Sequence, residues 1–230
     1  QALFPVTDRL SLLADAVQAA GRVPLSLAGV GADLLTLSAH KMHGPKGAGA
    51  LIVRKGVDVA PLIFGHQERK RRGGTENVPA LVGFGVAAQL AAQALAAGEP
   101  AEIAALRDRL ETGIKALWPM AQVNGVPSNA RAAARLPNTA SITFYSDDGR
   151  PENGEELLMR LDRAGVCVSM GAACSTGGNE PSHVLTAMGL KAAEAEATLR
   201  FSLGRDAGQA DVVRALDALA AIKNRGKVAA

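Results

Sequence analysis

Apolar and polar residues follow one another in short blocks whose lengths predict strands and helices. Leu10–Ala14 is apolar except at Ser11, and residues 32–37 form a second run rich in Leu. Runs of this length with few polar groups are typical of buried strands. Leu51–Val53 predicts a third strand that returns along the same sheet. The remaining runs predict helices over 79–97, 102–118, 153–164, 181–189 and 210–223, and strands over 140–144, 166–169 and 198–203.

This alternation of strands and helices is typical of an α/β fold. The pattern breaks near residue 98, where Gly98 is followed by Glu99 and Pro100. Residues 1–97 are therefore predicted to be the remainder of a larger domain with a mixed, mostly parallel sheet, and residues 98–230 a smaller α/β domain. The first residue is Gln and not Met, so we expect a piece of a longer chain.

Composition excludes several classes of protein. Hydrophobic residues make up 48% and charged residues 20% of the chain, which predicts a packed core and not disorder. The net charge of +3 is too small to indicate nucleic acid, and the absence of an uninterrupted run of 18 apolar residues predicts no membrane span. Cys167 and Cys174 make no disulfide framework, which favours a reducing, cytoplasmic location. Cys167, in an apolar segment, is predicted to be buried.

Lys41 ends the second strand, in the sequence Ser38-Ala39-His40-Lys41, and a glycine-rich turn follows it at 44–50. Ligands of open α/β sheets bind beyond the carboxyl ends of strands. A lysine held there in a partly desolvated pocket is able to bind a carbonyl cofactor. Taken alone, a strand-end lysine is more often simply solvated.

Pyridoxal phosphate needs a carboxylate beside its ring nitrogen and donors for its phosphate. Asp15 at a neighbouring strand end suits the first role, with Gln18 as a donor to the ring oxygen. Ser38 and His40 flank Lys41 and suit the phosphate. Asp15 has an ordinary alternative as the N-cap of the segment after it.

The run Arg69-Lys70-Arg71-Arg72 is open to three interpretations: a solvated loop, an anion-binding loop or a nucleic-acid patch. No aromatic residue interrupts it, so base stacking is poorly supported. Gly73 and Gly74 are candidates to offer backbone amides to a phosphate, and Thr75 to offer a hydroxyl.

Cys174 lies among small residues in the loop 169–178, which predicts an accessible thiol of the reactive kind, although an incidental surface cysteine fits the same pattern. Arg200, on a predicted strand of the second domain, suits a bidentate pair with a carboxylate or a structural ion pair.

Six segments taken together strongly resemble the cysteine desulfurases, in particular the NifS-like group, and they occur in the order of that family. They are Ala14–Gln18, Ser38–Lys41, Arg72–Asn77, the cysteine loop, Glu180–Leu185 and Arg200–Arg205. The part of the family that precedes these segments is missing here. Met170 stands where the family usually has serine.

The resemblance implies a fold-type I pyridoxal-phosphate enzyme, normally a homodimer, that converts L-cysteine to L-alanine. Lys41 would bind the cofactor and move the α-proton, Asp15 would pair with the pyridine nitrogen, and Gln18 would contact the ring oxygen. Ser38 and His40 would hold the phosphate, and Thr75 would reach the phosphate of the partner subunit. Arg200 would bind the substrate carboxylate.

Cys174 would accept the sulfur as a persulfide and pass it to an iron–sulfur scaffold or other acceptor protein, in nitrogen fixation or in general cluster assembly. The resemblance implies no resident metal, only a transient cluster shared between Cys174 and a scaffold. No nucleic-acid or membrane partner is expected. Two alternatives stay open: another class V aminotransferase or lyase, for which Cys174 has no use, and a catalytically incomplete fragment that only binds partners.

Overall fold

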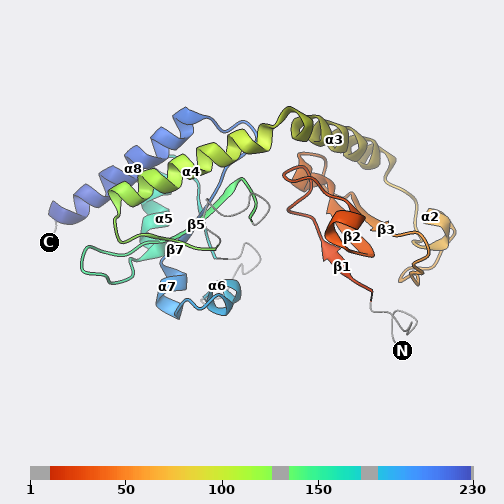
Figure 1. Cartoon of the computed structure of the whole chain (residues 1–230), viewed down its shortest axis with the longest axis horizontal. Coiled ribbons are helices and arrows are strands. Elements are labelled where there is room, and N and C mark those ends of the chain that lie inside the picture. Colours follow the sequence, from red (N-terminus) through yellow and green to blue (C-terminus); the bar gives the residue numbers. More distant parts are fainter. Residues whose placement is uncertain (1–10, 126–134, 172–180, 229–230) are drawn as a thin grey trace. The chain divides into compact units, whose positions relative to one another are not determined.

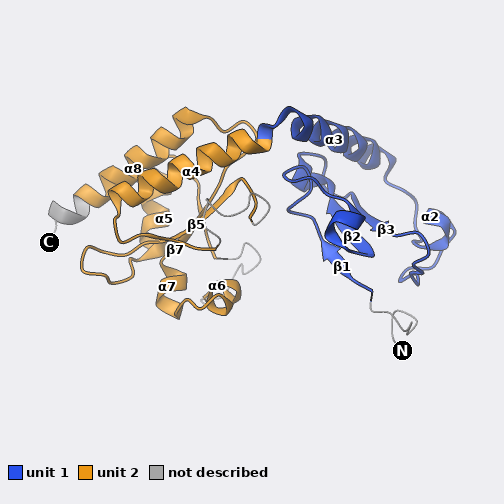
Figure 2. Ribbon diagram, viewed as in Figure 1, with its two compact units in different colours: residues 1–99 blue, residues 100–230 orange. Residues whose placement is uncertain are grey.

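The computed structural model describes residues 11–125, 135–171 and 181–228. The chain divides into two compact units, 1–99 and 100–230 (Figure 2). The first unit holds strands β1 (Leu13–Asp15), β2 (Leu34–Ser38) and β3 (Gly49–Val53) and helices α1 (Leu27–Val30), η1 (Ala39–Met42), α2 (Gln67–Lys70) and α3 (Val78–Ala97). The second holds β4 (Gln122–Val123), β5 (Thr139–Thr143), β6 (Ser169–Met170) and β7 (Thr198–Ser202) with α4 (Glu99–Leu117), α5 (Gly154–Arg163), α6 (His183–Ala187), α7 (Ala192–Glu196) and α8 (Gln209–Val228).

The sheet of the first unit has the order β1-β2-β3 (Figure 1). β1 and β2 are parallel with Asp15 opposite Thr36, and β2 and β3 are antiparallel with Ser38 opposite Gly49. The prediction of three strands in this stretch is confirmed, including the return of β3 along the sheet. Parallel pairing brings the carboxyl ends of β1 and β2 to the same edge.

Helix α3 begins at an Asn77 N-cap, whose side chain accepts a hydrogen bond from the Ala80 amide, and ends at Gly98 in the left-handed conformation. Its buried residues, Ala80, Ala87 and Ala94, lie seven apart and so share one face. Ala87 on that face packs in a cluster with Ala20 and Met42. Small residues let the helix approach η1 closely.

The other faces of α3 leave apolar residues exposed, among them Val78, Val82, Val86 and Leu90. By length and composition alone α3 is apolar enough to cross a membrane, with 22% of its apolar window buried. One such helix is weak evidence, since core helices of soluble proteins pass the same test. The expectation of no membrane partner therefore stays a prediction.

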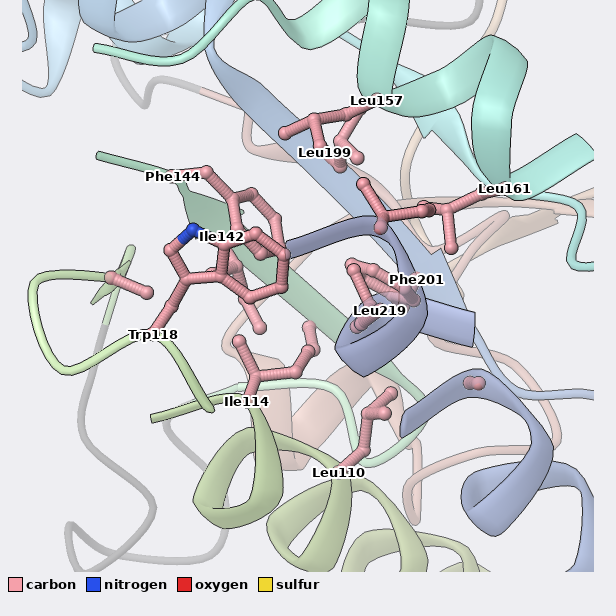
Figure 3. Close-up of a cluster of buried hydrophobic side chains, with 14 of the residues drawn as sticks. Leu110, Ile114, Trp118, Ile142, Phe144, Leu157, Leu161, Leu199, Phe201 and Leu219 are labelled. Atoms are coloured by element: carbon pink, nitrogen blue, oxygen red, sulfur yellow. The ribbon is translucent and has the colours of Figure 1, made fainter. Parts of the chain in front are cut away.

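The sheet of the second unit has the order β4-β5-β7-β6, and all of its pairs are antiparallel. Its core gathers side chains from the sheet and from α4, α5 and α8 (Figure 3). Trp118 lies edge-to-face against Phe144, with ring centroids 5.4 Å apart. The largest fully buried side chains are Phe144, Ile114, Ile142, Leu161, Leu199, Leu219, Thr143 and Thr198.

Two predictions for this unit are wrong. The strand predicted over 166–169 pairs only at Ser169 and Met170. Cys167, predicted to be buried, is an exposed free cysteine. Side chains of an extended segment alternate between faces, and Val166 and Val168 on either side of Cys167 pack against the core. Cys167 therefore faces outward.

Candidate functional site

The carboxyl edge of the β1–β2 pair carries most of the predicted site residues of the first unit. Asp15 is the last residue of β1, Ser38 is the last residue of β2, and Lys41 follows in η1. Because β1 and β2 run parallel and in register, this placement follows directly from the two apolar runs that form the strands. The edge combines a carboxylate, a hydroxyl, an imidazole and a primary amine.

Asp15 is exposed, and one of its oxygens, Oδ1, accepts two hydrogen bonds. The Val17 amide donates to it over 3.0 Å and the Thr36 hydroxyl over 2.9 Å. These two bonds hold the pKa of the Asp15 carboxyl below its ordinary value, and the bond from the Val17 amide has the larger effect. The segment after Asp15 is a series of turns and not an α-helix. Asp15 thus caps a turn and remains an ionised carboxylate at the strand end.

Gln18 is exposed three residues beyond Asp15, in the turn that follows β1. The Arg22 guanidinium donates to the Gln18 backbone carbonyl over 2.6 Å and lies 3.5 Å from its Oε1. Arg22 therefore fixes the position of the backbone that carries the Gln18 side-chain amide.

Ser38 and His40 contact each other, with 2.8 Å between Ser38 Oγ and His40 Nδ1. Lys41, one residue on, is half-buried in η1, where Ala39 and Met42 are its buried neighbours. The turn after η1 is pressed against α3: a Cβ at Gly44 would lie 3.0 Å from both the Ala39 carbonyl oxygen and the Ala87 Cβ. This close packing fixes the short helix that carries Lys41.

The basic segment is not the simple loop that its composition predicts. Glu68, Arg69 and Lys70 form part of α2 with positive φ angles, which cost L-residues of this size energy. The Gly73 amide donates to the Ile63 carbonyl over 2.7 Å, and the Gly74 amide to Gln67 Oε1 over 3.2 Å. The prediction that these two amides are offered to a phosphate is therefore wrong, because both are already used within the chain.

Thr75 follows these glycines and is exposed, with no hydrogen bond to its hydroxyl within the part of the chain that the structure describes. Its hydroxyl is the one donor of the predicted Gly73–Thr75 set that is available to a ligand.

Arg200 lies in the middle of β7 in the second unit, opposite Ser141 of β5 and Ser169 of β6. Its Nε is buried and has no hydrogen-bond partner among the described residues. A buried guanidinium nitrogen without a partner is costly in a finished fold. The arginine is therefore suited to an acceptor that is not among the described residues, and both the carboxylate pair and the structural ion pair stay predictions. Cys174 lies outside the described residues.

Sequence reasoning missed two residues of this region, Thr36 and Arg22. Thr36 is a lone hydroxyl inside the apolar run 32–37, and Arg22 follows Gln18 by four residues. A hydroxyl among the leucines of this run is the available signal for Thr36, since a hydroxyl shielded from water needs a partner.

Comparison with known proteins gives a consistent result. Residues 7–215 match the family model described as aminotransferase class-V. A relative described as a cysteine desulfurase, from Cereibacter sphaeroides, is 49% identical over 206 residues, which cover 89% of this chain and 50% of the relative.

Two solved structures extend the comparison. The NifS-like protein of Rickettsia africae is 32% identical with a TM-score of 0.77, covering 93% of this chain and 54% of that one. SspA in complex with cysteine is 32% identical with a TM-score of 0.59, and the match covers 84% of this chain and 50% of that one. The chain thus spans about half the length of the relatives it matches.

Proposed function

The chain belongs to the aminotransferase class-V family, and on that premise we propose that it is the part of a cysteine desulfurase that holds pyridoxal phosphate and accepts sulfur from L-cysteine. The observation that carries the proposal is the edge where β1 and β2 end, with Asp15, Ser38, His40 and Lys41 on two parallel strands and the turn after them. Relatives described as cysteine desulfurases and a similar structure that holds cysteine support the same substrate.

The donor set fits pyridoxal phosphate chemically. An Asp15 held in its ionised form suits a protonated ring nitrogen, and Lys41, partly shielded from water, suits the cofactor's carbonyl. Ser38, His40 and the free hydroxyl of Thr75 are donors suited to a phosphate. When bound, this cofactor supplies an electron sink for the carbanion formed at the substrate's α-carbon.

The chain's own residues then have distinct tasks in the proposal. Lys41 Nζ moves the proton of the substrate α-carbon, and the orphaned Arg200 Nε with its guanidinium binds the substrate carboxylate. The Cys174 thiolate attacks the substrate sulfur as the carbon–sulfur bond breaks. Cysteine and the thiol thereby yield alanine and a persulfide on Cys174, with no external oxidant.

The remaining parts of the proposal rest on the family. We propose a homodimer, in which Thr75 serves the partner's phosphate, a protein acceptor for the persulfide sulfur, and a cytoplasmic location whose reducing conditions keep thiols free. Because the chain spans about half of its relatives, the alternative of a fragment that binds partners without turnover is tested alongside.

The test is sulfide release from L-cysteine with added pyridoxal phosphate and dithiothreitol, the thiol that reduces the persulfide to sulfide and regenerates Cys174, with alanine measured in the same reactions. The full-length Cereibacter sphaeroides relative serves as the positive control. Cys174→Ala is expected to abolish sulfide release, and Cys167→Ala, which removes the other thiol, to leave it intact. Sulfide release that survives Cys174→Ala would indicate a lyase of the same fold. A wild-type chain that releases no sulfide would indicate a fragment that binds partners without turnover.

A further inference from the structure

Thr36 stands beside Asp15 in the parallel pair β1–β2. The strands are held together there by the Ala16 amide, which donates to the Thr36 carbonyl over 3.2 Å. The Thr36 hydroxyl donates to Asp15 Oδ1 over 2.9 Å, and the Val17 amide donates to the same oxygen over 3.0 Å. Both bonds therefore end on one oxygen of the carboxylate.

The second oxygen, Asp15 Oδ2, accepts no hydrogen bond from any residue in the described part of the chain. A carboxylate gripped through one oxygen has its plane fixed and its other oxygen open to a ligand. Thr36 is suited to this grip because a β-branched side chain has few χ1 choices, so the strand itself sets the direction of the hydroxyl.

We propose that Thr36 is a positioning residue of the cofactor site: its hydroxyl locks Asp15 Oδ1 so that Oδ2 is the oxygen presented to the protonated ring nitrogen of pyridoxal phosphate. This inference rests on the proposed function and adds to it a residue that acts through Asp15. Among the described residues the Thr36 hydroxyl bonds to Asp15 alone, and the β1–β2 bonds at this position are made by the backbone.

The first arm of the test uses the 230-residue chain without cofactor. Aspartate carboxyl carbons are labelled with ¹³C, the Asp15 signal is identified by its loss in Asp15→Asn, and its pKa is measured by NMR titration. Thr36→Val keeps the shape of the side chain and removes the hydroxyl. It is expected to raise the pKa of Asp15, because one of the two donors to the ionised form is gone.

Two variants separate a specific effect from general damage. Thr36→Ser restores the hydroxyl and is expected to return the pKa of Asp15 toward its wild-type value. Thr112→Val removes a threonine hydroxyl from helix α4, where it donates to the Asp108 carbonyl, and is expected to leave the pKa of Asp15 unchanged.

The second arm measures the dissociation constant for pyridoxal phosphate by absorbance titration. Thr36→Val is expected to weaken binding by about tenfold, the size of one hydrogen bond to a charged group, and Thr36→Ser by less than about twofold. An unchanged Asp15 pKa in Thr36→Val, or a Thr36→Ser variant as impaired as Thr36→Val, overturns the inference. Failure of the wild-type chain and every variant to bind the cofactor contradicts the proposed function instead.

Discussion

Gly154 is the position of the second unit where one added methyl group has the largest predicted consequence. It begins α5 and is buried, and a Cβ there would lie 2.0 Å from the Glu196 carbonyl oxygen. Glu196 ends α7, two residues before Thr198 opens β7, the strand that carries Arg200. Gly154→Ala therefore forces α5 away from the end of α7, which directly precedes β7.

The magnitude follows from the kind of atom that must move. The contact is with a backbone oxygen and not with the tip of a flexible side chain, so relief requires a shift of the helix by about 1 Å, and overpacking of this kind costs about 3 kcal/mol. The higher helix propensity of alanine returns at most about 1 kcal/mol. With a urea m-value of about 2 kcal/mol/M, the midpoint of unfolding is expected to fall by about 1 M or more.

Trp118 makes the measurement specific to this unit. It is the single tryptophan of the chain, is 2% exposed, and contacts Phe144 in the core beside α5. Urea unfolding is followed by its fluorescence. Gly208→Ala, in the same unit, is the matched control, because a Cβ there meets nothing within 4 Å. If Gly154→Ala shifts the midpoint no more than Gly208→Ala, the close approach of α5 to Glu196 is refuted.

Two further perturbations test other parts of the structure. Glu111 is buried between Arg107 and Arg135, so Glu111→Ala is expected to destabilise the second unit by about 3 kcal/mol in the Trp118 assay. Glu156→Ala, which removes the exposed partner of Arg160, is expected to change stability by about 0.5 kcal/mol or less, and equal effects of the two variants would contradict the buried ion cluster. The folded pKa of Asp15 lies below its unfolded value, so its ionised form adds stability above pH about 4 that is lost as the pH falls through the folded pKa. The gap in thermal midpoint between wild type and Asp15→Asn, followed by circular dichroism, is therefore expected to close on acidification, and a gap that widens would refute the assignment.

The positions of Asp15, Ser38 and Lys41 at the strand ends can be predicted from the sequence because they depend on local signals. Two apolar runs define β1 and β2, and the polar residues that follow each run lie at the strand ends. Once the strands pair in parallel, those residues share an edge without further information.

Other features depend on contacts that no local pattern records. The Thr36–Asp15 bond joins residues 21 apart in the chain. The Gly73 amide bonds to the Ile63 carbonyl across a turn that contains left-handed residues, and composition does not indicate that turn. Cys167 was misjudged because an apolar segment does not say which of its alternating side chains faces the core. β4, with two residues, and α7, with five, are too short for periodicity to detect.

The central claim is that Lys41 binds the cofactor, and reductive trapping tests it most directly. The chain is incubated with pyridoxal phosphate, treated with borohydride and digested, and the modified lysine is located by mass spectrometry. Lys41→Ala is the comparison variant, and Lys46, exposed in the glycine-rich turn nearby, is the internal control for random labelling. One dominant modified site at Lys41 is expected, and it is expected to vanish in the variant. Label found on Lys46 and other exposed lysines but not on Lys41 would contradict the claim.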